Sequence, residues 1–87
     1  MNIQNKEFKV GDFVRHVPSN QLAWIINDRY ELLWSSIGSI NQWSGLSDFR
    51  KTKRKFNIKT VLNKGLKKRY MDNLTYIEIL ARVKHAK

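Results

Sequence analysis

A dense group of basic side chains lies in the second half of the chain. Between positions 50 and 71 there are ten Lys or Arg residues and no Asp or Glu. These ten are Arg50, Lys51, Lys53, Arg54, Lys55, Lys59, Lys64, Lys67, Lys68 and Arg69. Like charges this close repel one another and destabilise a folded chain unless an anion screens them. Lys and Arg neutralise phosphates and release their condensed counterions, which favours binding and makes it salt-dependent. The block therefore predicts a polyanion-binding surface; a solvated run that only aids solubility is the alternative.

Aromatic residues flank or interrupt this block, and aromatic faces stack on unpaired nucleobases. Phe49 and Phe56 are expected in the core, whereas Tyr70, between Arg69 and Met71 in sequence, suits the core and the surface equally well. Trp34 and Trp43 end predicted strands beside loops that contain Ser and Gly. One of these two tryptophans is expected to be accessible, as a stacking platform or as the anchor of a protein contact. Trp34, Trp43 and Tyr70 are thus the candidates for stacking or for partner contact.

Other kinds of site find little support in the sequence. The chain has no Cys, which excludes disulfides, thiolate metal ligands and thiol nucleophiles. His16 and His85 lie in separate predicted elements, and His16 is expected to face solvent from a strand. The sequence has no G-x-S-x-G motif, no Gly-rich phosphate loop and no paired-carboxylate spacing. We therefore expect a non-enzymatic protein with no metal site and no cofactor.

The charge is divided unevenly between the two halves of the chain. The formal net charge is +10. Residues 1–49 contain four bases and five acids, and residues 50–87 contain thirteen bases and two acids. Such asymmetry is typical of proteins that bind nucleic acid or an anionic membrane surface. The longest apolar run, Leu22–Ile26, is far shorter than the 18 or more residues that a bilayer requires. The N-terminal residues lack the pattern of a signal peptide, so a cytoplasmic protein, nucleoid- or ribosome-associated and without membrane contact, is expected.

The neutral half, residues 8–49, is predicted to be β-structure. Short β-prone runs are separated by turns of Gly, Pro, Ser, Asn and Asp. Phe8–Val10 leads into the turn pair Gly11-Asp12, and the predicted strands are Phe13–Val17, Gln21–Ile26, Tyr30–Trp34 and Ile40–Trp43. The run at 21–26 is apolar on both parities, which indicates a central strand with Trp24 in the core. Short strands with closely spaced turns predict an antiparallel sheet or a small barrel.

The basic segment that follows, residues 50–72, is compatible with two structures. Alternation over 56–62 favours a strand, and Asn63-Lys64-Gly65 would turn it into a second strand over 66–71. The alternative is a helix over 60–71 with Leu62 and Leu66 on one side. Gly65 in the middle of that helix costs about 1 kcal/mol relative to Ala. The hairpin is therefore favoured.

Residues 75–85 are predicted to form a helix. Thr75 and Glu78 have the spacing of a capping box, and Leu74 and Ile79 have that of a hydrophobic staple. The expected buried face consists of Ile79, Leu80 and Val83. Alternating apolar residues over 77–83 leave a strand as the alternative, but the cap signal favours the helix.

The run Lys9-Val10-Gly11-Asp12-Phe13-Val14-Arg15 resembles the opening of SH3-like small barrels of the KOW, Tudor and YodC-like kinds. In those barrels a short "GD-x-V" strand is followed by a hairpin whose third strand ends in an aromatic residue, and Trp34 is similarly placed. The resemblance covers residues 8–49 and implies a small antiparallel barrel. Many such barrels bind nucleic acid or ribonucleoprotein machines and others bind peptides, so the fold alone does not assign a function.

The expected fold class is mainly β (α+β), in one domain over residues 1–87. An SH3-like barrel would be followed by a basic hairpin or helix and a short C-terminal helix. The expected function is binding of DNA or RNA phosphates by the basic block, largely without reading sequence. The alternative is a protein-interaction module or small regulator that docks on an acidic protein or on a nucleoprotein machine such as RNA polymerase or the ribosome. There Trp34 or Trp43 would anchor the contact and the cations would steer association. Binding through the block requires that its cations form one exposed face that only an external anion neutralises.

Overall fold

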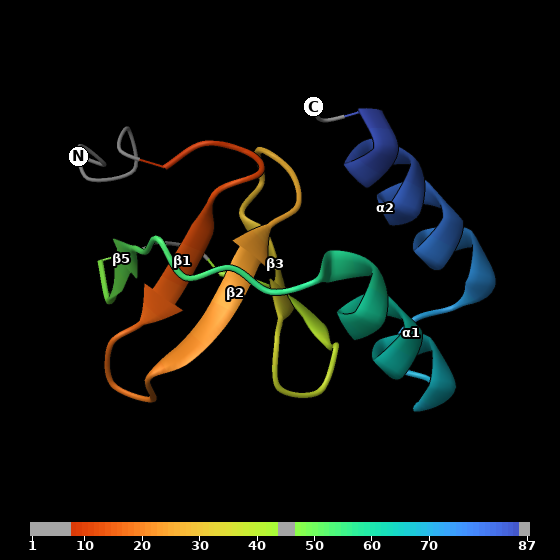
Figure 1. The fold of residues 1–87 in the computed structure, drawn as a ribbon, viewed down its shortest axis with the longest axis horizontal. Coiled ribbons are helices and arrows are strands. Elements are labelled where there is room, and N and C mark those ends of the chain that lie inside the picture. The colour runs from red at the N-terminus through yellow and green to blue at the C-terminus, as the bar shows by residue number, and fades with distance from the viewer. Residues whose placement is uncertain (1–7, 44–46, 86–87) are drawn as a thin grey trace.

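The computed structural model describes residues 8–43 and 47–85 of the chain, and within these it contains five strands followed by two helices (Figure 1). The elements are β1 (Phe13–His16), β2 (Gln21–Ile25), β3 (Glu31–Trp34), β4 (Ile40–Gln42), β5 (Phe49–Lys51), α1 (Ile58–Lys67) and α2 (Asn73–His85). The predicted α+β class is confirmed. Val10 and Gly11 form a turn before β1, close to the turn predicted at Gly11-Asp12. The sheet has a fifth strand, β5, which was not predicted from the sequence.

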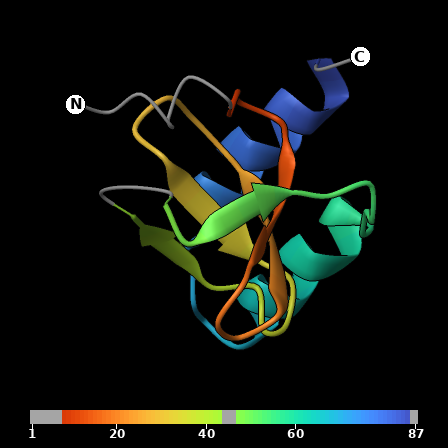
Figure 2. The same cartoon turned by 90° about the vertical axis from the view of Figure 1, so that its left-hand side faces the viewer.

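All neighbouring strands of the sheet are antiparallel, in the order β4-β3-β2-β1-β5. β4 and β5 are the two edges and, in the described residues, do not pair with each other, so the sheet is open. Figure 2 views it from the β5 edge and shows that its strands twist across one another. The predicted antiparallel sheet is therefore confirmed, whereas closure into a barrel is not observed.

Both faces of the sheet are buried, because the strands alternate apolar side chains toward each face. We call one side the aromatic face; its buried residues are Phe8, Val14, Ala23, Ile25, Leu32, Trp34 and Phe49. We call the other side the helix face, where Trp24, Ile26 and Leu33 pack against Val61, Leu62, Met71 and Ile79. The run at 21–26 has apolar residues at both odd and even positions because β2 is a central strand and is buried on both faces. Trp24 lies in the core, as predicted.

Residues 58–67 form helix α1, so the favoured hairpin is wrong and the alternative helix is right. Asn57 caps the helix, and its Oδ1 accepts a hydrogen bond from the Thr60 amide at 3.0 Å. Gly65 is in the helix because the loop between β3 and β4 crosses it. A Cβ on Gly38 of that loop would lie 2.5 Å from the Gly65 nitrogen, and a Cβ on Gly65 would lie 2.8 Å from Met71 Cε. The helix propensity lost at Gly65 is offset by this close packing.

Helix α2 begins at Asn73, two residues before the predicted start. Asp72 takes the capping role predicted for Thr75, since its Oδ1 accepts from the Thr75 amide at 2.8 Å. The predicted hydrophobic staple is wrong, because Leu74 is 73% exposed. The predicted face is confirmed: Ile79 is buried, and Leu80 and Val83 pack against the same cluster. Neither helix, over the residues described, is both long and apolar enough to cross a bilayer.

Candidate nucleic-acid interface

The basic segment runs along the molecule from one edge of the sheet to the helices. It starts in edge strand β5, continues through the linker 52–57 and enters α1, and Figure 1 shows this linker passing in front of β1 and β2. The Phe56 ring packs edge-on against Phe13, with 5.0 Å between ring centroids, and this contact holds the linker on the helix face. Phe49 is fully buried and Phe56 is partly buried, as predicted for both.

All ten predicted cations of the segment are exposed. Within residues 8–43 and 47–85 they make a single ion pair, between Lys51 Nζ and Asp12 Oδ2 at 3.8 Å. Arg50 Nη1 donates to the Ser47 and Phe49 carbonyls at 3.1 and 2.9 Å, and Lys64 Nζ donates to the Ser36 carbonyl at 3.4 Å. In the described structure the side chains of the remaining cations have no hydrogen bond or ion pair. These are Lys53, Arg54, Lys55, Lys59, Lys67, Lys68 and Arg69.

The sheet adds an eleventh cation that was not among the predicted site residues. Arg15 of β1 lies directly opposite Arg50 of β5. Residues in this position have Cβ atoms about 4.5–5.5 Å apart, and like charges there are destabilising. Neither arginine forms an ion pair with a described carboxylate. Because neighbouring strand residues alternate, this arginine pair points to the helix face, which the linker crosses. The sequence would have indicated this arginine pair only if β1 had been paired with β5, and β5 was not predicted.

Four rings gather at the other side of the same strands. The ring of His16 lies 5.8 Å from Trp34, 5.4 Å from Trp43 and 4.9 Å from Phe49, measured between centroids. The structure thus brings Trp34 and Trp43 together, at 5.8 Å. Trp34 is only 8% exposed, whereas Trp43 is partly buried and retains some accessible surface.

The prediction that His16 faces solvent is right only in part, because the residue is half-buried. His16 is directly opposite Phe49 in the β1–β5 pairing, and this register turns its ring into the aromatic cluster. Its Nδ1 shares a hydrogen bond with Ser19 Oγ at 2.7 Å. Among the residues described, no three His, Asp or Glu side chains come together as a metal site would require.

Tyr70 is placed away from the two tryptophans. It follows α1, is 49% exposed and lines a cavity of about 350 Å³ on the helix side together with Met71 and Ile79. The three predicted stacking candidates therefore do not form one site. Arg69, which precedes Tyr70, has a φ of 65° at the end of α1. The Tyr70 amide donates to the Gly65 carbonyl at 2.9 Å and closes the turn there.

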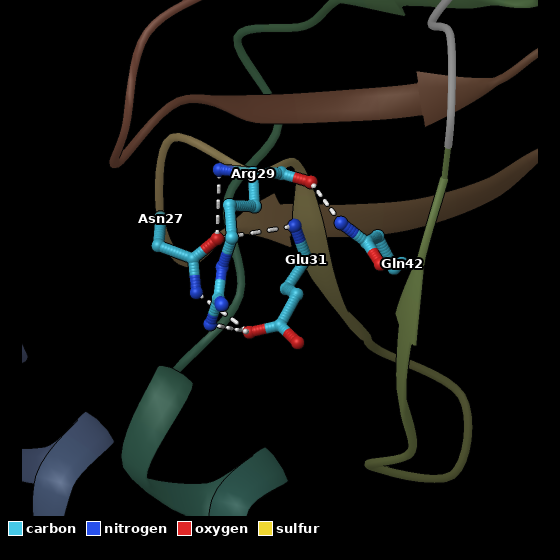
Figure 3. A network of polar contacts seen from close by, with 4 residues as sticks. All are labelled: Asn27, Arg29, Glu31 and Gln42. Atoms are coloured by element: carbon cyan, nitrogen blue, oxygen red, sulfur yellow. Dashed lines mark hydrogen bonds and ion pairs between the residues drawn. The ribbon is translucent and has the colours of Figure 1, made fainter.

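The turn between β2 and β3 shows how the neutral half uses its charges (Figure 3). Asn27 Oδ1 accepts from the Arg29 amide at 3.0 Å, and Asn27 Nδ2 donates to Glu31 Oε1 at 2.6 Å. The same Glu31 oxygen lies 3.7 Å from Arg29 Nη2. Gln42 Nε2 of β4 donates to the Arg29 carbonyl at 3.1 Å. Charged groups of this turn thus serve to fix its backbone.

Comparison of the chain with protein-family models, with curated proteins and with solved structures found no match. The function must therefore follow from the chemistry of the surface itself.

Proposed function

We propose that the protein is a non-enzymatic nucleic-acid-binding module whose basic segment contacts the phosphates of DNA or RNA. The observation that carries this proposal is the set of exposed, unpaired cations between Lys53 and Arg69. Mutual repulsion makes such a set costly in the free protein. A phosphate backbone removes the repulsion, and the release of its counterions adds a favourable entropy.

The sheet is the scaffold in this proposal. We regard it as an open form of the SH3-like small barrel suggested by residues 9–15, holding the arginine pair and the start of the linker on one side. Arg15 and Arg50 lie close enough to bind the same or neighbouring phosphates, since guanidinium groups match phosphate geometry. Contacts of this kind position the ligand and supply affinity, and they carry no direct sequence information.

A charge-matched pair of variants tests the proposal. Lys53→Glu/Lys55→Glu and Lys9→Glu/Arg82→Glu change the net charge equally, but Lys9 and Arg82 are exposed outside the basic segment. If two phosphate contacts are lost, affinity for a short DNA duplex should fall at least about 50-fold at 0.1 M salt, or about 0.9 log unit per contact. The control variant should lose far less. Equal losses in both variants would show that only net charge matters and would contradict a localised surface.

The same variants, titrated with polyglutamate, test docking on an acidic protein. Trp34, one of the two predicted anchors, is buried in the sheet core and offers little surface to a partner. If the protein binds no nucleic acid but binds polyglutamate with the same dependence on Lys53 and Lys55, the nucleic-acid proposal fails and the docking alternative replaces it.

A further inference from the structure

A hollow of about 540 Å³ opens beside the aromatic cluster, between the β1–β2 turn and the β3–β4 loop. Its volume is within the roughly 300–1,000 Å³ typical of small-molecule sites. His16 and Trp43 supply aromatic surface to it, and the largely buried Trp34 also lines it. Ser19, Ser39 and Asn41 are among the neutral polar residues around it. Apart from His16, none of the described residues that line the hollow is ionisable.

This lining matches a flat, neutral, heteroaromatic ligand. Aromatic side chains stack on the face of a nucleobase and tolerate any base. The edge of the same base needs hydrogen-bond donors and acceptors, and an Asn amide offers both. In the described structure the exposed Asn41 side chain has no hydrogen-bond partner of its own. An aliphatic or strongly charged ligand would leave these groups unused.

One cation of the basic segment, Lys64, lies next to the hollow. Lys64 Nζ is 3.4 Å from the carbonyl of Ser36, which lines it. A base in the hollow would therefore have positive charge close by for its flanking phosphates.

We infer that the hollow takes one unpaired nucleobase, so that the protein prefers single-stranded nucleic acid over duplex. The inference rests on the proposed function, since the basic segment supplies the backbone contacts. In a duplex the bases are stacked on one another and paired, and their faces are not available to a side chain. A duplex would then be held by its phosphates alone.

The test uses two single-stranded DNA ligands of equal length and charge, one normal and one with abasic sites in place of its bases. We expect the normal strand to bind about 5- to 150-fold more tightly, the range for stacking of one base. Trp43→Leu should abolish this preference, because Leu fills the space but offers no aromatic face. Trp43→Phe should retain most of it.

The outcomes separate the inference from the proposed function. Equal affinity of the normal and abasic strands overturns the inference and leaves phosphate binding intact. Absence of binding to either strand and to a DNA duplex of the same length overturns both. If Trp43→Leu does not fold, tryptophan fluorescence of the unmodified protein replaces it. Quenching by the normal strand and not by the abasic strand supports the inference, and equal quenching contradicts it.

Discussion

Charged side chains have different surroundings in residues 8–43 and in the basic segment. In the first region the carboxylate of Glu31 contacts Arg29 and Asn27 within one turn, and Asp12 accepts from the Lys9 amide. In the second, most of the cations are exposed without a partner in the described structure. Charge in the first region stabilises local backbone structure. Like charges this close in the second region disfavour the folded state unless an anion screens them, which is why we propose that this region binds a polyanion.

The largest effect on stability is expected where the two regions touch. Gly65→Ala would place a methyl group against the Gly38 backbone and the Met71 side chain. Although Ala is the better helix former, we expect the free energy of unfolding to fall by about 1–3 kcal/mol, as in overpacked cores. Urea unfolding followed by circular dichroism measures this.

Lys67→Ala is the matched control, because Lys67 is exposed on the same helix. It should leave the unfolding free energy nearly unchanged. A Gly65→Ala protein as stable as the unmodified one would show that the two regions are not closely packed there.

The arginine pair should separate binding from stability. Arg15→Gln removes the like charge opposite Arg50. We expect the protein to gain about 0.2–1 kcal/mol of stability, the range for cross-strand pairs. Affinity for nucleic acid should fall up to about tenfold at 0.1 M salt through the loss of one phosphate contact.

Thermal unfolding and a binding titration of the same sample measure the two effects. A parallel loss of stability and affinity in Arg15→Gln would mean that Arg15 supports the fold and not the ligand.

A similar effect on stability, with a smaller effect on affinity, is expected at the end of α1. Arg69 adopts a φ of 65°, a conformation that disfavours side chains with a Cβ. Arg69→Gly should raise the unfolding free energy by up to about 1 kcal/mol and lower nucleic-acid affinity slightly. Denaturant unfolding with parallel binding measurements tests this, and a loss of stability would contradict it.

The smallest effect is a dependence of helix α2 on pH, and it involves the carboxylate of Asp72 and none of the basic cations. Hydrogen bonds from the backbone and side chain of Thr75 lower the pKa of Asp72 below its usual value of 3.8. The Asp72 carboxylate therefore stabilises the start of α2 above that value, and its contribution is lost as the pH falls through the lowered pKa. Helicity measured between pH 5 and pH 2 should drop with this transition.

In Asp72→Asn the cap is retained and this titration is removed, since Asn is about as good a capping residue as Asp. An unchanged helicity profile in that variant would contradict the assignment of the transition to Asp72.

Local signals predicted much of the fold. Short β-prone runs between turns gave four of the strands approximately, and the spacing of Ile79, Leu80 and Val83 gave the buried side of α2. The structure of 58–67 was missed because Gly65 reads locally as a turn residue. A glycine is needed at position 65 because the backbone of Gly38, which is distant in sequence, packs against it.

The same limit applies to the candidate site. The exposure of the cations could be predicted, because the run between positions 50 and 71 is basic and contains no acids. The arginine pair and the position of His16 depend on the β1–β5 register, which joins residues more than thirty positions apart. Because β5 has only three residues, no periodicity within Phe49–Lys51 indicates a strand.

The most direct test of the central claim is the salt dependence of binding to a short DNA duplex. If about six cations of the basic segment contact phosphates, a plot of log K against log salt concentration should have a slope of about −5. Lys53→Glu/Lys55→Glu should reduce the slope by about 2, from the loss of two contacts. A slope near zero, or a slope that this variant leaves unchanged, would contradict the assignment of phosphate binding to the basic segment.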